Sequence, residues 1–138
     1  MRKILFRGFN ENPFGEEKIN VNGKIFSGTW YNGFFMIERS SGLPMIKTEK
    51  NNWKYVIPET VGEYIGIKDK NGKMIFENDI VYYNGTNYKV VFGIRNGISF
   101  YGIIIDENKT CPFDNMDPVN QMEIVGNIYD NNEKDISE

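Results

Sequence analysis

Short runs in which apolar and polar residues alternate, separated by turn residues, recur along most of the chain. A period of two is typical of half-buried β-strands. Only one segment, 114–121, is compatible with a helical turn. We therefore predict a mainly β protein with little or no helix. The pattern predicts strands at about residues 3–9, 24–31, 34–39, 44–48, 53–57, 64–68, 73–76, 79–83, 87–95, 98–105 and 122–129.

Five Asn-Gly pairs mark predicted turns between these strands. Both residues tolerate the positive φ angles that a two-residue type I′ hairpin turn requires. Most of the pairs have apolar or aromatic residues on both sides, as expected at the tips of β-hairpins. The pairs are Asn22-Gly23, Asn32-Gly33, Asn71-Gly72, Asn84-Gly85 and Asn96-Gly97.

The stretch YIGIKDKNGKMIFENDIV, residues 64–81, fits either a calcium-binding loop or a turn between two strands. A calcium loop with Gly72 at its sixth position has Ile67 at the first and Asn78 at the twelfth. Neither residue suits, because the first position needs an oxygen ligand and the last a bidentate Glu. We predict a hairpin with a two-residue Asn-Gly loop, which places on one face Ile65, Ile67, Met74 and Phe76.

Three further residues of this stretch have predicted structural roles. Gly66 within a strand indicates a bulge or a close backbone approach. Asp69 and Asp79 are short carboxylates of the kind that accept backbone N–H bonds at turns and strand starts. This turn chemistry is favoured over a catalytic role for either carboxylate.

The segment GTWYNGFF, residues 28–35, is predicted to form an aromatic hairpin. A turn at its Asn-Gly pair places Trp30 opposite Phe35 and Tyr31 opposite Phe34, so both faces are aromatic. A hairpin with one solvent-exposed face alternates apolar with polar residues. This hairpin is aromatic on both faces, so it must be enclosed in the fold or covered by a partner. Both alternatives stay open, and in the second these four aromatic residues form an interface.

A third alternative is the stacking of nucleic-acid bases on aromatic rings of the basic N-terminal half. Aromatic residues in strands more often form core or cross-strand pairs, so protein contacts are favoured. The candidate stacking residues are Trp30, Tyr31, Trp53 and Tyr55. The candidate phosphate contacts are Lys24, Arg39, Lys47 and Lys54.

Composition and charge add to the strand pattern. The chain of 138 residues has no alanine and two leucines but 18 isoleucines, which disfavours helix and suits strands. The net charge is +3 over residues 1–60, +1 over 61–105 and −7 over 106–138. We expect an N-terminal β region over 1–60, a second β region over 61–130, and a frayed acidic tail over 131–138.

The absence of certain residues excludes several kinds of chemistry. Without histidine, and with Cys111 as the one cysteine, the sequence excludes Ser-His-Asp and Cys-His catalysis, His-bearing zinc sites and an intrachain disulfide. It has no phosphate-loop or dinucleotide-binding motif. Its apolar runs are too short for a signal peptide or a membrane span, so we expect a soluble intracellular protein.

The chemistry that remains depends on carboxylates. Asp106, Glu107 and Lys109 form the densest charged cluster, for which a solvated loop is favoured over a metal site. We expect no bound metal, no cofactor and no enzymatic activity.

Three segments resemble the YopX family of phage and prophage proteins: the opening MRKILFRGF, the middle stretch YIGIKDKNGKMIFENDIV and the closing EIVGNIYDN. The family-motif positions present here are Arg2, Phe6, Arg7, Tyr64, Gly66, Asp69, Gly72, Ile75, Asp79, Gly126 and Asn127. Departures from the family pattern are Ile65, Ile67, Phe76 and Asn78. The resemblance implies a mainly β fold with an SH3-like barrel at about 61–130, in the cytoplasm of a bacterial host. It implies no activity.

These observations lead to two hypotheses from different classes. The first is a non-enzymatic protein-interaction module that self-associates, with an unidentified host or phage protein as another candidate partner. The alternative is a nucleic-acid-binding module that uses the basic N-terminal half. A carboxylate- or magnesium-dependent enzyme is a distant third.

Overall fold

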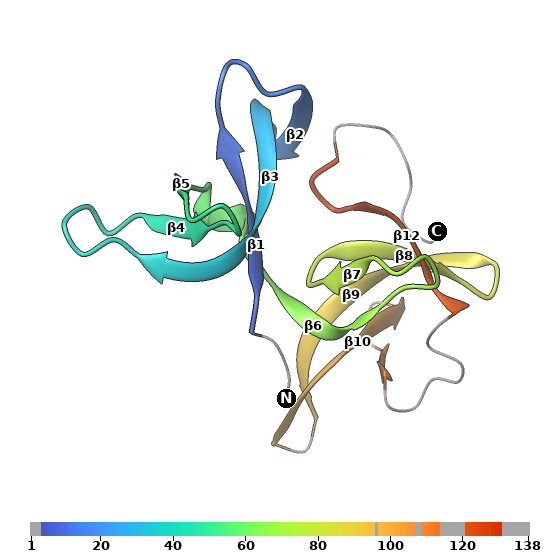
Figure 1. Cartoon of the computed structure of the whole chain (residues 1–138). Helices are drawn as coiled ribbons and strands as arrows, with labels where there is room; N and C mark the ends of the chain where they lie inside the picture. The colour runs from blue at the N-terminus through green and yellow to red at the C-terminus, as the bar shows by residue number, and fades with distance from the viewer. Residues whose placement is uncertain (1–3, 96, 107–108, 114–120, 131–138) are drawn as a thin grey trace. The chain divides into compact units, whose positions relative to one another are not determined.

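The computed structural model describes residues 4–95, 97–106, 109–113 and 121–130, and these form β-strands for most of their length (Figure 1). The prediction of a mainly β protein is confirmed. The described residues fall into two compact units: one comprises the chain up to Tyr64 with Tyr129 and Asp130, and the other runs from Ile65 to Ile128. Among the residues that are described, no helix is long and apolar enough to cross a membrane.

The first unit is built on β3 (Lys24–Ile37), a strand long enough to pair with three others. All pairings are antiparallel, and the strand order is β5-β4-β3-β1-β6, with β2 also paired to β3. The first residues of β6 belong to this unit, and its later residues belong to the second. The other strands are β1 (Phe6–Glu11), β2 (Glu17–Val21), β4 (Pro44–Lys47), β5 (Trp53–Tyr55) and β6 (Gly62–Lys68).

The sheet of the first unit curls until the segment around β5 meets β1. The side-chain amide of Asn10 donates to the carbonyl oxygen of Tyr55 at 2.7 Å, and the Ile57 N–H donates to the carbonyl oxygen of Phe9 at 2.8 Å. A 3-10 turn, η1 (Pro58–Thr60), follows, and the Thr60 hydroxyl accepts the Phe9 N–H at 2.9 Å.

The predicted aromatic hairpin at residues 28–35 is wrong, because β3 continues through Asn32 and Gly33. Trp30 lies opposite Phe9 of β1, while Phe34 lies opposite Lys47 of β4. Asn32 does not adopt the positive φ of a type I′ turn. At Gly33 any Cβ would collide with the carbonyl oxygen of Lys47. The glycine therefore permits the close approach of β4 instead of a turn.

The core of the first unit takes buried side chains from β1, β2, β4 and the segment after β5, among them Phe9, Ile19, Ile46 and Val56. Phe9 is fully buried and its ring meets that of Trp30 edge to face at 5.4 Å between centroids. Trp30 also lies 6.0 Å from Tyr129, whose hydroxyl donates to the carbonyl oxygen of Glu59 at 2.6 Å. With these ring contacts on two sides, Trp30 is half-buried in the unit.

The second unit contains a five-stranded sheet in the order β11-β10-β9-β8-β12, and β7 paired with β6. The described strands do not close into the expected SH3-like barrel, since β11 and β12 form the two ends of this order. The strands are β7 (Met74–Phe76), β8 (Asp79–Tyr83), β9 (Thr86–Arg95), β10 (Ile98–Asp106), β11 (Lys109–Pro112) and β12 (Glu123–Asn127). The core residues are Ile65, Ile75, Val81, Val90, Ile103, Phe113 and Met122.

The hairpin between β6 and β7 has a loop one residue longer than predicted. The Asp69 N–H donates to the carbonyl oxygen of Lys73, and the Gly72 N–H donates to that of Asp69 at 3.0 Å. Gly72 has φ +82°, but Asn71 is not in the positive-φ region. This is the pattern of a three-residue loop with a glycine bulge rather than a type I′ turn. The longer loop shifts the pairing of β7 with β6 by one residue, and this shift brings Ile75, not Met74, into the core with Ile65.

Candidate binding surface

The family-motif residues that the structure describes lie in strands or in the turn after β6. Phe6 and Arg7 lie in β1, and the Arg7 guanidinium lies 4.9 Å from the centre of the Trp30 ring. Tyr64 and Ile75 are buried. The positive φ of +92° at Gly66 agrees with its predicted special backbone role. Arg2 lies outside the described residues.

Asp69 is a buried carboxylate whose two oxygens accept three backbone N–H groups. Oδ1 accepts from Asn71 at 2.8 Å and from Lys73 at 2.9 Å, and Oδ2 accepts from Ile124 at 3.0 Å. Burial acts to raise the pKa of Asp69, but the hydrogen bonds, that of Ile124 first, outweigh it and hold the pKa below its ordinary value. Asp69 thus fastens the turn after β6 to β12.

Asp79 has a similar role at the start of β8. Its side chain is 1% exposed, and Oδ2 accepts the Phe76 N–H at 2.8 Å across the β7–β8 turn. In the sheet Asp79 lies opposite Asn127, and Gly126 lies opposite Ile80. The middle and closing motifs therefore meet in one pair of strands, and turn chemistry accounts for both carboxylates.

No three Cys, Asp or Glu side chains come together as a metal-binding cluster in the part of the chain that the structure describes. The Cys111 thiol is half-buried beside the carbonyl oxygen of Pro112, at 3.6 Å. Of the predicted charged cluster, Lys109 is exposed at the start of β11, while the side chains of Asp106 and Glu107 lie outside the described set. The helical turn expected at 114–121 and the tail 131–138 also lie mainly or wholly outside it.

The structure separates the four aromatic residues of the predicted hairpin. Trp30 and Phe35 are both half-buried, and the Phe35 ring lies 5.1 Å from that of Phe6. Tyr31 is half-buried, and the Lys54 ammonium lies 5.4 Å from its ring centre. Phe34 is 64% exposed. Of the four, Phe34 alone presents most of its surface to solvent.

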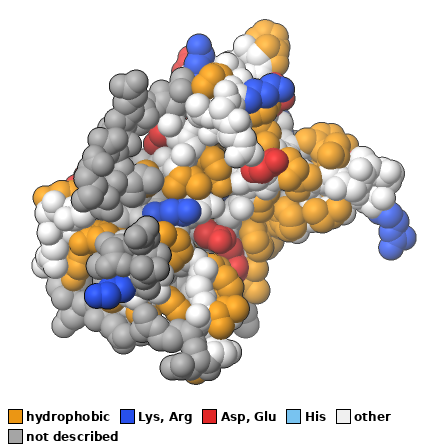
Figure 2. All heavy atoms as spheres, turned by 180° about the vertical axis from the view of Figure 1, so that it is seen from behind, with side chains coloured by type: hydrophobic (Ala, Val, Ile, Leu, Met, Phe, Trp, Pro, Cys, Tyr) orange, Lys and Arg blue, Asp and Glu red, His pale blue; other side chains and the backbone are white. Residues whose placement is uncertain are grey.

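Phe34 is part of an apolar surface that spans three strands. In the register, Phe34, Lys47 and Trp53 form one cross-strand row, and Met36, Met45 and Tyr55 form the next. Alternate residues of a strand share a face, so the two rows lie on the same side of the sheet. We call these six residues the β3–β5 face. Figure 2 shows hydrophobic side chains gathered over the β3–β4 hairpin, the arm that points left in Figure 1 and right in Figure 2.

The β3–β5 face is apolar where a solvated sheet face is normally polar. Phe34 is 64%, Tyr55 46%, Met36 40% and Trp53 40% exposed. On the opposite side of the same strands, Ile46 is fully buried and Phe35 half-buried, so that side faces the interior. Met45, in the middle strand of the face, is only 9% exposed, so the uncovered apolar surface consists of Phe34, Met36, Trp53 and Tyr55 around it.

One acidic group, Glu38, borders this face, and one basic group, Lys47, lies within it. Glu38 accepts hydrogen bonds from the Ser41 hydroxyl at 2.6 Å and the Tyr55 hydroxyl at 2.8 Å. These bonds, that from Ser41 first, lower the pKa of Glu38, and the Glu38 carboxylate raises the pKa of Tyr55. The Lys47 ammonium lies 5.8 Å from the centre of the Trp53 ring. Glu38 is therefore charged at neutral pH, and it fixes the Tyr55 ring.

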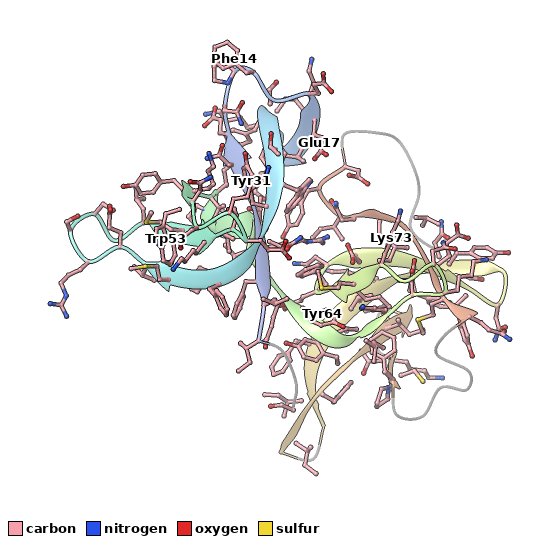
Figure 3. The ribbon with its side chains drawn as sticks, in the orientation of Figure 1. Phe14, Glu17, Tyr31, Trp53, Tyr64 and Lys73 are labelled. Carbon is pink, nitrogen blue, oxygen red and sulfur yellow. The ribbon has the colours of Figure 1, made fainter. Side chains whose placement is uncertain are left out.

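The four basic residues proposed as nucleic-acid contacts do not form one basic surface. Lys47 pairs in register with Trp53, whereas Lys54 pairs with Ile46, so the two lysines point to opposite sides of the sheet. Lys24 begins β3 and lies over Phe26, and Arg39 lies in the β3–β4 loop. Figure 3 shows Trp53 beside β4 and Tyr31 near β1.

The sequence pointed to four residues of the β3–β5 face but did not show that they form one surface: Phe34 was a candidate interface residue and Lys47 a candidate phosphate contact. Trp53 and Tyr55 were considered for base stacking, but Met36 and Met45 were not considered at all. Phe34 and Met36 do show the spacing of a strand face, yet Phe35 and Ile37 between them are also apolar. The strand register decides which of these residues is covered, and only the structure supplies it.

The family model described as YopX protein matches residues 6–134, nearly the whole chain. No curated protein matches the sequence.

Proposed function

The chain belongs to the YopX family, and we propose that it is a non-enzymatic protein-interaction module that associates with a second copy through the β3–β5 face. The observation that carries the proposal is the uncovered apolar surface of Phe34, Met36, Trp53 and Tyr55. Aromatic residues and methionine are enriched at protein interfaces, and soluble monomers seldom leave such surfaces exposed over large areas.

Self-association is the simplest way to cover this face. Most soluble oligomers are closed homo-oligomers, and a two-fold axis brings the same patch of two copies together. The setting we propose is the cytoplasm of a bacterium that carries the phage or prophage, where a host or phage protein is a second candidate partner. A photoreactive phenylalanine analogue placed at position 34 tests the proposal.

The photoreactive protein should give a covalent dimer on illumination at micromolar concentration. Position 14 is a matched control, because Phe14 is 92% exposed but lies in the β1–β2 loop, outside the β3–β5 face (Figure 3). Equal cross-linking at both positions, or none at position 34, would count against an interface on this face.

Nucleic-acid binding is the second candidate, and one observation supports it. The Lys47 ammonium lies over the exposed Trp53 ring, a combination that suits a stacked base with its phosphate. In that case Lys47→Glu should weaken binding of single-stranded oligonucleotides, whereas Lys54→Glu, on the opposite side of the sheet, should not. Binding should also fall steeply with added salt. Equal effects of the two substitutions would argue against a site at Trp53.

A further inference from the structure

Four of the five Asn-Gly pairs lie wholly among the described residues, and this dipeptide is susceptible to spontaneous deamidation. The backbone nitrogen of the glycine attacks the Cγ of the asparagine, a C–N bond forms, and the proton of that nitrogen leaves with the amide group as ammonia. Water then opens the cyclic imide to aspartate or isoaspartate. Because the glycine N–H must be released before it reacts, a hydrogen bond from it protects the pair.

Three of these four pairs have a glycine whose nitrogen is held or enclosed. The Gly23 N–H donates to the side-chain oxygen Oδ1 of Asn20 at 2.8 Å. The Gly72 N–H donates to the carbonyl oxygen of Asp69 at 3.0 Å. Gly33 is buried within the continuous strand β3, where pairing with the neighbouring strands keeps the main chain in place. In all three pairs the fold therefore opposes attack on the asparagine.

The fourth pair, Asn84-Gly85, has no such protection. Among the described residues, the Gly85 N–H has no hydrogen-bond acceptor. In other respects the turn matches that of Asn22-Gly23: both pairs are exposed, both have two positive φ angles, and both form a two-residue loop between paired strands. The two turns therefore differ mainly in the state of the glycine N–H.

One flanking position explains the difference between the two turns. Asn20 stands two residues before Asn22 and supplies the oxygen that binds the glycine N–H. The corresponding position before Asn84 holds Tyr82, whose one side-chain oxygen lies at the far end of the ring. We propose that Asn84 is the Asn-Gly site at which the folded chain deamidates faster than at Asn22 or Asn71.

The product would change the second unit and leave the matched turn of the first unit intact. Aspartate at position 84 adds a negative charge to the β8–β9 turn, and isoaspartate also adds a carbon to its main chain. A two-residue loop fits the flanking strands only in a narrow set of conformations. Isoaspartate should therefore disturb the pairing of Tyr83 with Thr86. This inference is independent of the self-association proposed above.

Substitution of the two flanking residues tests the inference in the full-length protein. The unchanged protein, Tyr82→Asn and Asn20→Ala are incubated in mildly alkaline buffer, and fragmentation mass spectrometry follows the modification of each asparagine. In the unchanged protein Asn84 should react about fivefold faster than Asn22, since one hydrogen bond changes a population by about that factor. Tyr82→Asn should slow the reaction at Asn84, and Asn20→Ala should raise the rate at Asn22 toward that of Asn84. Both substituted side chains are exposed, so the core should not change.

The same protein unfolded in concentrated urea is the reference. There the turns are lost, and Asn22 and Asn84 should react at similar rates because glycine follows both. A difference that persists in urea would come from local sequence and would overturn the inference. Equal rates at the two sites in the folded protein, or faster reaction at Asn22 or Asn71, would also overturn it. So would rates that neither substitution changes. Circular dichroism verifies that each variant is folded.

Discussion

Asp69 accepts a hydrogen bond at 3.0 Å from the backbone N–H of Ile124, which follows it by 55 positions in the chain. Two more interactions join the same turn to the start of β12: the Lys70 N–H donates to the carbonyl oxygen of Met122, just before the strand, at 2.9 Å, and the Lys70 ammonium lies 3.4 Å from the Glu123 carboxylate. The stability of the second unit therefore depends on the bonds that hold this turn against its last strand, β12.

Asp69→Asn should destabilise the protein strongly. An amide has one acceptor oxygen and places N–H donors where backbone N–H groups now point, so we expect a loss of about 2–3 kcal/mol in the free energy of unfolding. Urea denaturation measures it. The control is Glu123→Gln, which breaks the exposed ion pair with Lys70 and should cost no more than about 1 kcal/mol. Similar costs for the two substitutions would contradict the role given to Asp69.

The contribution of Asp69 should depend on pH. Its pKa is lowered in the folded protein, so its stabilisation is complete above the unfolded pKa of about 3.9 and is lost as the pH falls through the folded pKa. The difference in stability between the unchanged protein and Asp69→Asn should stay constant from about pH 8 to pH 5 and shrink toward pH 3. A difference that is the same at pH 3 and pH 7 would show that ionisation of Asp69 does not matter.

Gly72→Ala and Gly33→Ala should differ in cost because the two glycines have different roles. At Gly72 a Cβ meets no atom within 4 Å, so only the φ of +82° is strained and the cost should be about 1 kcal/mol. At Gly33 a Cβ collides with the carbonyl oxygen of Lys47 and should disturb the pairing of β3 with β4, at a clearly larger cost. Thermal melting of both variants ranks them, and the reverse order would contradict the continuous β3.

Calcium and magnesium should not raise the melting temperature. Both oxygens of Asp69, the first carboxylate of the Asp-Lys-Asn-Gly stretch, already accept backbone N–H groups. A metal ion would have to replace these bonds. A saturable rise in the melting temperature with millimolar calcium would imply a site that this geometry does not provide.

The Asn-Gly pairs show how far local sequence determined the turns. Asn22-Gly23 and Asn84-Gly85 have the two positive φ angles of a type I′ turn, as predicted. At residues 71–72 the neighbouring Asp69 carboxylate binds the Asn71 and Lys73 N–H groups and selects a longer loop. The pair at 32–33 is part of a strand, because contact with β4 outweighs the local turn preference. Asn96 lies outside the described residues.

Two strands were missed for different reasons. β2 does carry a signal, since Ile19 and Val21 alternate with exposed Lys18 and Asn20. β11 is short, ends at Pro112 and lies at the edge of its sheet, so its sequence has no clear period. Asn78, one of the departures from the family pattern, has φ +75°, as the tolerance of Asn for left-handed backbone allows.

The candidate surface was less predictable than the fold. From the sequence, Phe34 and Phe35 are equally apolar neighbours in a strand. The register of β3 with β4 places Phe35 opposite the buried Ile46 and Phe34 opposite the half-buried Lys47. Exposure of Phe34 therefore follows from a contact between strands that local sequence does not encode.

Sedimentation velocity of Phe34→Glu beside Phe14→Glu tests the β3–β5 face most directly. Both side chains are largely exposed, so neither substitution should disturb the core or the circular dichroism spectrum. The account predicts that the unchanged protein and Phe14→Glu sediment as a dimer or larger closed assembly at micromolar concentration, while Phe34→Glu sediments as a monomer. A monomer for the unchanged protein across a wide concentration range, or an assembly that Phe34→Glu leaves intact, would contradict it.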